Sequence, residues 1–448
     1  MSILTAADVE AAGGRLQLRP GQRLTPLARD RAKELGVEIV EADAPPLSRP
    51  GTSAAPPTSS AKAPPPAQGP LAKEVSARSV APATKPSDRA AGRTFAPLVS
   101  GAMYRRNALG PQGTGGGQSG STRGRRPRAG VVGAGHVGAM AALRLAESDL
   151  FDHVALVDVV SGLAAGLALD MWHGASVYGF STPLSGSEEL SSLRGCDYII
   201  ITAGKPRQPG MTRTDLTAGN AAIMKSVCEG IRQHAPDATL VVVSNPLEEM
   251  THLAAQYTGF AQSRVLGMAG VLDSARFCAL VGLTGKARPQ DVQALALGSH
   301  GPEMVIPLSQ AFIGNTPIES MLDASTLNAI VERTRESGGE VVKLLKKGSA
   351  YFSPAESAAA MVRIMASGSN EVIAACVRPQ GAYGLTDARV GLPVRLNSRG
   401  LKEVVQLPLR PDELQALRVA AARIAQRIDE LAQLPSAPST PAPNVAAA

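Results

Sequence analysis

The sequence predicts an α/β fold in which a doubly wound parallel sheet is followed by an α+β domain. Three observations lead to this prediction. From residue 128 onward, short apolar runs alternate with stretches of helical periodicity, as strands and their covering helices do in such a sheet. The first run, at 129–132, leads into a glycine-rich turn at 133–138. The second run ends in an acid, Asp158.

The chain begins with a small module over residues 1–42, which is predicted to be β-α-β. Residues 15–18 alternate as a strand does, and Pro20-Gly21 turns the chain. Thr25-Pro26 is typical of a helix start and Gly36 of a helix end. Residues 37–40 then form a second strand.

Residues 43–126 are rich in Pro, Ala, Ser and Gly and are predicted to be a disordered linker. They contain twelve Lys or Arg and only three Asp or Glu, in a chain whose net charge is +7. The basic character therefore belongs to the linker, and it is no argument that the folded part binds nucleic acid. The linker also lacks the interleaved aromatic residues on which bases stack.

The remaining elements divide the folded part into two domains. Further apolar runs predict strands at 154–158, 198–202, 239–244 and 265–268, near 292–297, and at 390–396 and 404–407. Apolar residues at helical spacing from Leu414 to Leu431 predict a closing helix. We expect a first domain over 127–272, a second over 273–432, and a disordered tail over 433–448.

The glycine turn and Asp158 together predict a dinucleotide-binding site on a Rossmann-type fold. Gly133 permits the tight turn, Gly135 lets the backbone approach a pyrophosphate, and Gly138 lets the helix pack on the strand. The helix N-terminus offers free N–H groups and a positive dipole end to the phosphates. Asp158 would accept hydrogen bonds from a ribose diol and repel a 2′-phosphate, which favours NAD over NADP.

A dinucleotide site identifies a cofactor but not a reaction. Of the six histidines, His300 directly follows a predicted strand, in the sequence Gly298-Ser299-His300-Gly301. An imidazole at this place can give or take the proton that accompanies a hydride transfer. Taken alone, a histidine at a strand end is more often structural.

Two charged stretches strengthen the catalytic interpretation. Asp273 and Arg276 are one helical turn apart on one face. The carboxylate can fix an imidazole tautomer, and the guanidinium can hold a substrate carboxylate; the alternative is an ordinary i,i+3 salt bridge. The Pro- and Gly-rich loop at 203–215 presents Arg207 and Arg213. Such a loop can close over a site and exclude water, although a solvated basic loop has the same composition.

Residues 128–432 resemble the lactate/malate dehydrogenases, and the malate dehydrogenases most closely. The resemblance covers about two thirds of the chain. Its motifs are GAGHVG at 133–138, ITAGKPRQPGMTRTDL at 201–216, VSNPLEEMT at 243–251, GMAGVLDSARF at 267–277, GSHG at 298–301 and GSAYFSPAESAAAMV at 348–362.

The resemblance implies a role for each matching residue. His300 would donate and accept the proton, with Asp273 as its orienting partner, and Arg276 would bind the C1 carboxylate of the substrate. Arg213 would polarise the reacting carbonyl, and Asn245 would hydrogen-bond the substrate oxygen near the nicotinamide. The implied cofactor contacts are Gly133, Gly135, His136, Val137, Gly138, Asp158, Asn220 and Asn245.

Substrate choice is expected to depend on Arg207. The family typically has Arg here when the second substrate group is a carboxylate, and Gln in lactate enzymes. The methyl group of pyruvate would leave this guanidinium unpaired in a closed site, so we expect oxaloacetate and malate as substrates. Two departures are notable. Pro302 follows His300-Gly301 where the family usually has an acid, and Glu248-Glu249 replaces a more common Asp-containing sequence.

The first forty residues resemble a short module near the N-termini of some proteins of bacterial microcompartments. The matching sequences are LTPLARD at 24–30 and ELGV at 34–37. The resemblance implies that residues 1–126 target or tether the protein to a shell. A minor solubilising extension is the alternative.

The sequence thus predicts an NAD-dependent malate dehydrogenase. The first alternative is a lactate or other 2-hydroxyacid dehydrogenase that recycles NAD as microcompartment cargo, and the second is a mainly targeting or tethering role for the extension. The family commonly forms dimers or tetramers, so we expect a homodimer or homotetramer. Four distant cysteines without CxxC pairing favour a reducing cytoplasm and no metal site. No run has transmembrane length and no signal peptide is evident, so we expect no membrane partner.

Overall fold

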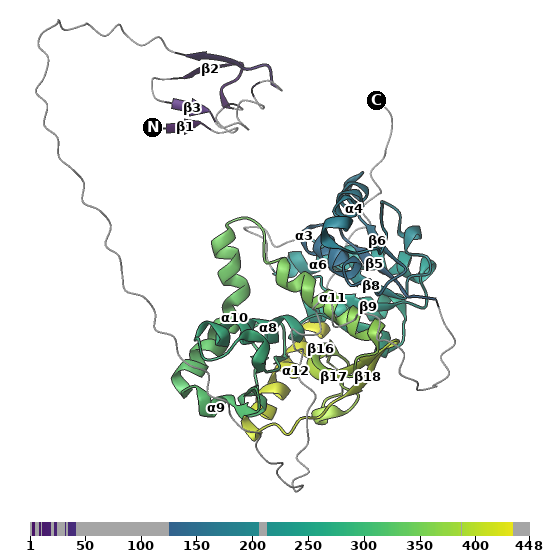
Figure 1. Ribbon diagram of the computed structural model, residues 1–448, viewed down its shortest axis with the longest axis vertical. Coiled ribbons are helices and arrows are strands. Elements are labelled where there is room, and N and C mark those ends of the chain that lie inside the picture. The colour runs from purple at the N-terminus through teal and green to yellow at the C-terminus, as the bar shows by residue number, and fades with distance from the viewer. Residues whose placement is uncertain are drawn as a thin grey trace, which may run out of the picture. The chain divides into compact units, whose positions relative to one another are not determined.

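Figure 1 shows the computed structural model, which describes residues 2–4, 9, 11–18, 22–24, 32, 35–41, 125–205, 213–386 and 388–432. The chain divides into two compact units, Met1–Arg89 and Ala90–Ala448. Three predicted segments lie outside the described residues. They are the linker up to residue 124, the tail over 433–448, and most of the helix expected between Thr25-Pro26 and Gly36.

The first unit contains two pairs of parallel strands. β1 (Ser2–Leu4) pairs with β3 (Gln22–Leu24), and β2 (Arg15–Leu18) pairs with β4 (Glu38–Glu41). The two strands predicted for this unit are confirmed as β2 and β4. The sequence does not predict β1 and β3, because three residues are too few to show an alternation. A small core consists of Val9, Ala32 and Val37.

The second unit is built on a parallel sheet. Its strands are β5 (Arg128–Val132), β6 (His153–Val157), β7 (Leu184–Ser187), β8 (Tyr198–Ile201), β9 (Thr239–Val242) and β10 (Val265–Gly267). They lie in the order β7-β6-β5-β8-β9-β10, and neighbours are parallel. The order reverses at β5, as in a doubly wound sheet. The predicted fold class is confirmed; β7, with one apolar residue, is not predicted by the sequence.

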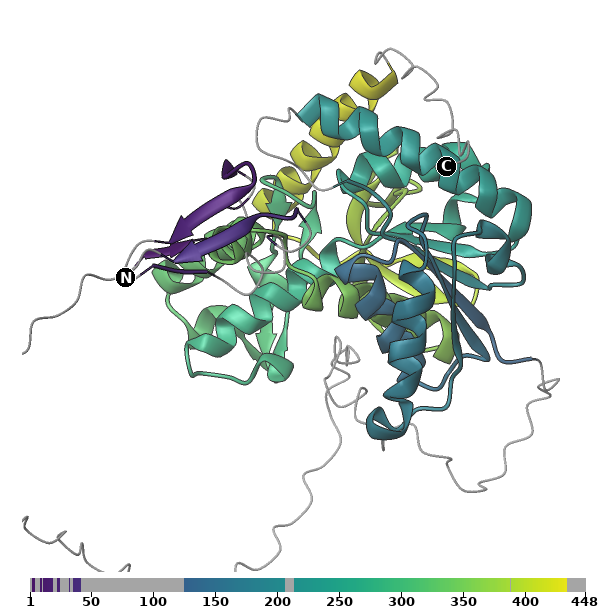
Figure 2. The same ribbon diagram turned by 90° about the horizontal axis from the view of Figure 1, so that it is seen from above.

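Helices cover both faces of this sheet (Figure 2). Val131 of β5 belongs to one core, with α3 (His136–Ala146) and α11 (Phe352–Ser367). The next residue, Val132, belongs to the other core, with α6 (Arg213–His234) and α7 (Leu247–Thr258). Because successive strand side chains point to opposite faces, a strand covered on both sides needs a continuous apolar run.

Antiparallel strands extend the same sheet beyond β10. β16 (Val372–Val377) pairs with β10, and β17 (Val390–Asn397) pairs with β16. β18 (Gly400–Val404) and β12 (Leu297–Gly298) both pair with β17. The sequence predicts β17 but not β16, whose six residues are all buried. Such an unbroken apolar run cannot be told from a buried helix by periodicity.

Two strand predictions in this half need correction. The single strand expected near 292–297 is divided, because β11 (Val292–Gln293) pairs with β14 (Phe312–Ile313) whereas β12 pairs with β17. The strand expected at 404–407 lies at 400–404. Gly400 adopts a φ of 103°, which permits a tight turn after β17 and starts the return strand early.

Three further helices complete the second half: α8 (Gly270–Leu283), α10 (Ala324–Leu345) and α12 (Pro411–Ala432). α12 confirms the predicted closing helix, and its Leu417 and Ile424 are fully buried. The shorter elements are α4 (Leu163–His173), α5 (Ala175–Tyr178), α9 (Ile318–Met321), β13 (Met304–Val305) and β15 (Thr316–Pro317). Within the described ranges, no helix is long and apolar enough to cross a membrane.

Candidate active site

The carboxyl ends of the parallel strands bring several loops to one edge of the sheet. Gly133 follows β5, Asp158 follows β6, Ala203 follows β8 and Asn245 lies just beyond β9. Neighbouring loops are joined directly, since the Ser244 hydroxyl donates to Ala203 O at 2.6 Å. Ligands of doubly wound sheets bind at this edge, where the strand order reverses.

The glycine turn has the backbone that a dinucleotide needs. Gly133 has a φ of 102°, which L side chains rarely adopt. A Cβ on Gly138 would lie 1.8 Å from Gly133 O, whereas a Cβ on Gly135 would meet no atom of the described residues within 4 Å. No described residue therefore fills the space above the start of α3, and Gly135, the residue before the helix, makes no side-chain cap hydrogen bond. The first N–H groups of α3 are thus available to a pyrophosphate.

Asp158 forms a hydrogen bond that stabilises the glycine turn. Its Oδ2 accepts from Ala134 N at 2.6 Å, and its Oδ1 accepts from Val160 N at 2.9 Å. A carboxylate has about four acceptor sites, so both oxygens keep capacity for a ribose diol. The sequence predicts the ribose contact, and the structure adds a support for the turn.

Three of the expected cofactor contacts also contact other parts of the protein. Asn220 of α6 is buried; its Oδ1 accepts from Lys205 N at 2.7 Å and its Nδ2 donates to Asn245 O at 2.7 Å. Its amide therefore ties two edge loops together. Val137 packs against the apolar core. The His136 ring lies 5.0 Å from the Tyr351 ring, which joins the glycine turn to the segment before α11.

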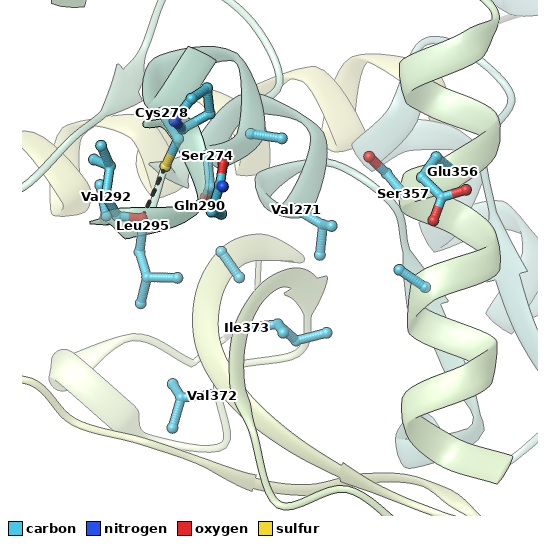
Figure 3. Close-up of a pocket in the computed structure, with 15 residues that line it drawn as sticks. Val271, Ser274, Cys278, Gln290, Val292, Leu295, Glu356, Ser357, Val372 and Ile373 are labelled. Atoms are coloured by element: carbon cyan, nitrogen blue, oxygen red, sulfur yellow. Dashed lines mark hydrogen bonds between the residues drawn. The ribbon is translucent and has the colours of Figure 1, made fainter. Parts of the chain in front are cut away.

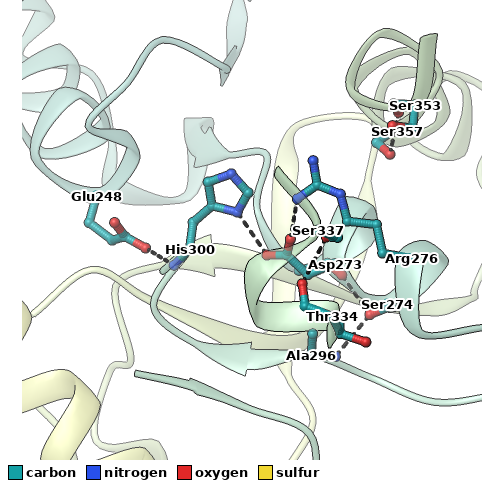
Figure 4. Close-up of polar contacts among 11 residues, drawn as sticks. Glu248, Asp273, Ser274, Arg276, Ala296, His300, Thr334, Ser337, Ser353 and Ser357 are labelled. Atoms are coloured by element: carbon teal, nitrogen blue, oxygen red, sulfur yellow. Dashed lines mark hydrogen bonds and ion pairs between the residues drawn. The ribbon is translucent and has the colours of Figure 1, made fainter. Parts of the chain in front are cut away.

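A second cluster consists of a histidine, a carboxylate and a guanidinium (Figure 4). His300 Nδ1 lies 2.7 Å from Asp273 Oδ2, and Arg276 Nη1 donates to Asp273 Oδ1 at 3.1 Å. The Asp273 side chain is 2% exposed, against 19% for His300. A carboxylate on Nδ1 leaves Nε2 for a substrate. The structure thus brings together the three residues that the sequence singles out, and the pair on α8 is no ordinary surface salt bridge.

The surroundings of His300 favour its protonated form. Burial alone lowers the pKa of the imidazole, and Arg276 acts in the same direction. The charge and hydrogen bond of Asp273 and the charge of Glu248 outweigh both, so the pKa is raised above 6.5. Such an imidazole can hold a proton near neutral pH and give it to a substrate oxygen.

Glu248 is a site residue that the sequence marks only as a departure from the family. It is 3% exposed in the first turn of α7, and its Oε1 accepts from His300 N at 2.5 Å. An acid in the first turn of a helix is an ordinary preference. Nothing in the sequence distinguishes this buried acid from a solvated one.

Glu303 fastens the other end of the His300 loop. Its Oε2 accepts from Ser299 Oγ at 3.0 Å, and its Oε1 lies 3.2 Å from Arg423 Nη1 of α12. The family usually has an acid at the position of Pro302. In this chain the loop is instead held by the carboxylate of the next residue, Glu303.

A separate apolar cavity of about 280 Å³ lies against α8 (Figure 3). It is lined by Val271, Ser274 and Cys278 of α8, together with residues of α11 and β16. Asp273 and His300 do not line it. Since Asp273 lies on another face of α8, this cavity is not part of the acid–base cluster.

The two loop arginines differ in what the structure describes. Arg207 lies outside the described residues. Arg213 is the first residue of α6, so the last part of the loop predicted at 203–215 is helical. Asp215 in the first turn suits a helix N-terminus. In the part of the chain that is described, no three His, Cys, Asp or Glu side chains form a metal-binding group.

A dinucleotide cradle and a histidine–carboxylate pair at one edge of a doubly wound sheet define a nicotinamide-dependent dehydrogenase. The family follows from comparison with known proteins. The model of the lactate/malate dehydrogenase NAD binding domain matches residues 128–267, and that of the alpha/beta C-terminal domain matches residues 270–434. The chain belongs to the lactate/malate dehydrogenase family and binds NAD.

Individual relatives agree over the same part of the chain. Malate dehydrogenase of Nostoc punctiforme is 40% identical over 304 residues, which are 68% of this chain and 92% of the relative. The structure of malate dehydrogenase from Salinibacter ruber has a TM-score of 0.66 at 36% identity, covering 68% of this chain and 98% of the other. Lactate dehydrogenase from Cryptosporidium parvum, complexed with lactic acid and the cofactor, has a TM-score of 0.67 at 30% identity, with 69% and 99% covered.

Proposed function

We propose that this protein is an NAD-dependent malate dehydrogenase, which interconverts malate and oxaloacetate. The observation that carries the proposal is the cluster of His300, Asp273 and Arg276. It places an acid–base group, His300, close to a guanidinium that can bind a substrate carboxylate. The relatives named malate dehydrogenase support the choice of substrate; the one from Nostoc punctiforme is 40% identical over 92% of its length.

His300 moves the proton. During reduction, its protonated ring donates from Nε2 to the ketone oxygen, and during oxidation the neutral ring accepts the proton back. Asp273 holds Nδ1 at 2.7 Å and stabilises the imidazolium. Arg276 uses one N–H for Asp273, and its other donors bind the C1 carboxylate of the substrate.

The cofactor is held by the edge of the parallel sheet. The turn containing Gly133, Gly135 and Gly138 binds the pyrophosphate, and Asp158 binds the ribose diol. Asn220 acts through the loops that it ties together. When bound, NAD supplies the acceptor or donor of the hydride at C2 of the substrate.

Three residues complete the site by their match to the family. Asn245 hydrogen-bonds the substrate oxygen, and Arg213 stabilises the charge that develops on it. Arg207 pairs with the second carboxylate and selects oxaloacetate over pyruvate.

Exchange of Arg207 for Gln tests the substrate assignment. In R207Q the second carboxylate loses its charged partner, so kcat/KM for oxaloacetate falls at least about tenfold more than kcat/KM for pyruvate. The matched control, R207K, keeps a charge and retains the preference for oxaloacetate. Steady-state rates with both substrates, with NADH and with NADPH, provide the measurement. Equal losses on the two substrates would remove Arg207 as the selector.

A lactate or other 2-hydroxyacid dehydrogenase that recycles NAD is the second candidate. The fold suits this candidate as well, because a lactate dehydrogenase structure has a TM-score of 0.67 and a malate dehydrogenase structure one of 0.66. The same assay separates the two, because this candidate requires pyruvate to be the better substrate of the unmodified protein.

We also infer that the protein forms a homodimer or homotetramer through α4 and α5. Large apolar side chains are exposed there, with Val177 85%, Leu169 56% and Trp172 43% exposed. An exposed patch of this kind is typical of an interface. Analytical ultracentrifugation of V177K, which places a charge in the patch, is expected to show a smaller species than the unmodified protein.

For residues 1–126 we propose a tethering role inside a bacterial microcompartment. The separate core of the first unit, around Val9 and Val37, supports a function apart from catalysis. Deletion of residues 1–126 is expected to abolish localisation to the shell and leave the kinetics unchanged. Diffuse localisation of the intact protein, in a host that makes the shell, would leave only a solubilising extension.

A further inference from the structure

Glu248 is a buried carboxylate for which the mechanism above has no use. It is 3% exposed, and a charge buried this deeply is costly unless it is paired. Its neighbour Glu249, 2% exposed, is paired with Arg427 at 3.1 Å. The contact that the structure shows for Glu248 is with His300, whose backbone N–H donates to Oε1 at 2.5 Å.

We propose that Glu248 is a second positioning carboxylate of His300, which fixes the backbone of the catalytic loop and stabilises the protonated imidazole by its charge. The inference rests on the proposed role of His300. According to this inference, two carboxylates set the pKa of His300: Glu248 on α7 and Asp273 on α8.

The geometry places Glu248 close enough to act on the ring. The backbone nitrogen of a histidine is only three bonds from its ring, so a carboxylate on that nitrogen lies near the imidazole. Asp273 holds the ring itself at Nδ1. In Figure 4, Glu248 and Asp273 approach His300 from opposite sides. Glu248 of α7 thus holds the backbone of His300, and Asp273 of α8 holds its ring.

The charges around His300 favour this assignment. From α8 it faces Asp273 and Arg276, and from α7 it faces Glu248. On its own loop, Glu303 is occupied by Ser299 and by Arg423. Arg276 opposes protonation of the ring, while both carboxylates favour it.

The same coupling acts in the other direction. Burial raises the pKa of the Glu248 carboxyl above its ordinary value, and the charge of Glu249 adds to the rise. The hydrogen bond and the charge of His300 act in the opposite direction and limit it. Carboxylate and imidazolium therefore each favour the charged form of the other, as coupled groups do.

The test is the pH dependence of kcat/KM in E248Q, measured with NADH and oxaloacetate and with NAD and malate. Gln keeps an acceptor for His300 N but removes the charge. In a plot of log kcat/KM against pH, the curve bends at the pKa of His300. This bend is expected to move to lower pH by about one unit, which is the lower end of the effect of a nearby opposite charge. The same imidazole titrates in both directions, so both bends are expected to move to lower pH. A structural role alone would lower the plateau and leave the bend in place.

Matched variants make the outcome decisive. E249Q changes the adjacent buried acid, which pairs with Arg427, and its bend is expected at the position of the unmodified enzyme. E248D keeps the charge and is expected to restore the bend. If E248Q loses too much activity, the titration of the His300 ring, measured by NMR on the NAD-bound protein and assigned with H300N, gives the same shift directly.

The two proposals fail in different ways. Full activity in H300N would overturn the proposed function itself. An inactive H300N together with an unmoved bend in E248Q would overturn only the inference about Glu248. An equal movement of the bend in E249Q would also overturn it, because the effect would then be one of general charge.

Discussion

The glycine turn and the His300 cluster lie in the same folding unit but are built from different material. The turn uses backbone groups of one short segment, with Asp158 only 24 residues from its partner Ala134. The cluster uses side chains of three segments, since His300 is 27 residues from Asp273 and 52 from Glu248. The glycine turn depends on the absence of side-chain atoms, whereas the His300 cluster depends on charged side chains held in fixed positions. Substitutions should therefore damage cofactor binding and proton transfer separately.

Exchange of His300 for Asn is the largest test of this separation. Without a group that moves the proton, kcat is expected to fall by about 10²–10⁴-fold. The affinity for NADH, followed by fluorescence titration, is expected to stay unchanged, because the glycine turn makes no use of the imidazole. A parallel loss of NADH affinity would show that cofactor binding also depends on His300, which would contradict the separation.

Two glycines of the turn provide the next test. Gly135 has a φ of −65°, and a Cβ there would meet no atom of the described part of the chain within 4 Å. G135A is expected to keep its melting temperature and to lose about tenfold in NADH affinity, or about 1.4 kcal/mol, because the methyl group occupies the place of the pyrophosphate. A Cβ on Gly138 would collide with Gly133 O, so G138A is expected to lose about 1–3 kcal/mol of stability.

Thermal denaturation and NADH titration of both variants separate the two effects. If G135A melts as early as G138A, the open space above α3 serves packing and not a ligand.

The same contrast explains what the sequence can predict. Gly133, Gly138 and Asp158 lie within one β-α-β segment, so their spacing alone predicts a cofactor site. Asp273 and His300 are far apart in the chain, and the sequence supplies only a helix face and a strand end. The family resemblance is what pairs them before the structure does.

The residues that escape prediction are those whose burial depends on distant elements. Glu248 reads as an ordinary acid at a helix start, and only its packing against the loop of His300 makes it a buried charge. β16 reads as any apolar run until β10 and β17 lie on either side of it. The early start of β18 depends on the turn at Gly400, a local event that an apolar pattern does not register.

The smallest effect concerns stability and pH, and it again separates the two sites. Burial lowers the pKa of His300, but Asp273 and Glu248 leave it raised above 6.5 in the folded protein. A raised pKa means that the folded state binds the proton more tightly. The stability that this adds is complete below pH 6.5 and is lost as the pH rises through the folded pKa. The melting-temperature advantage of the unmodified protein over H300N is therefore expected to shrink as the pH rises from 6.5 through the folded pKa. G135A changes no titratable group, so its difference from the unmodified protein should stay constant over the same range. An advantage over H300N that grows with pH would mean that folding holds His300 neutral, which would contradict the role of both carboxylates.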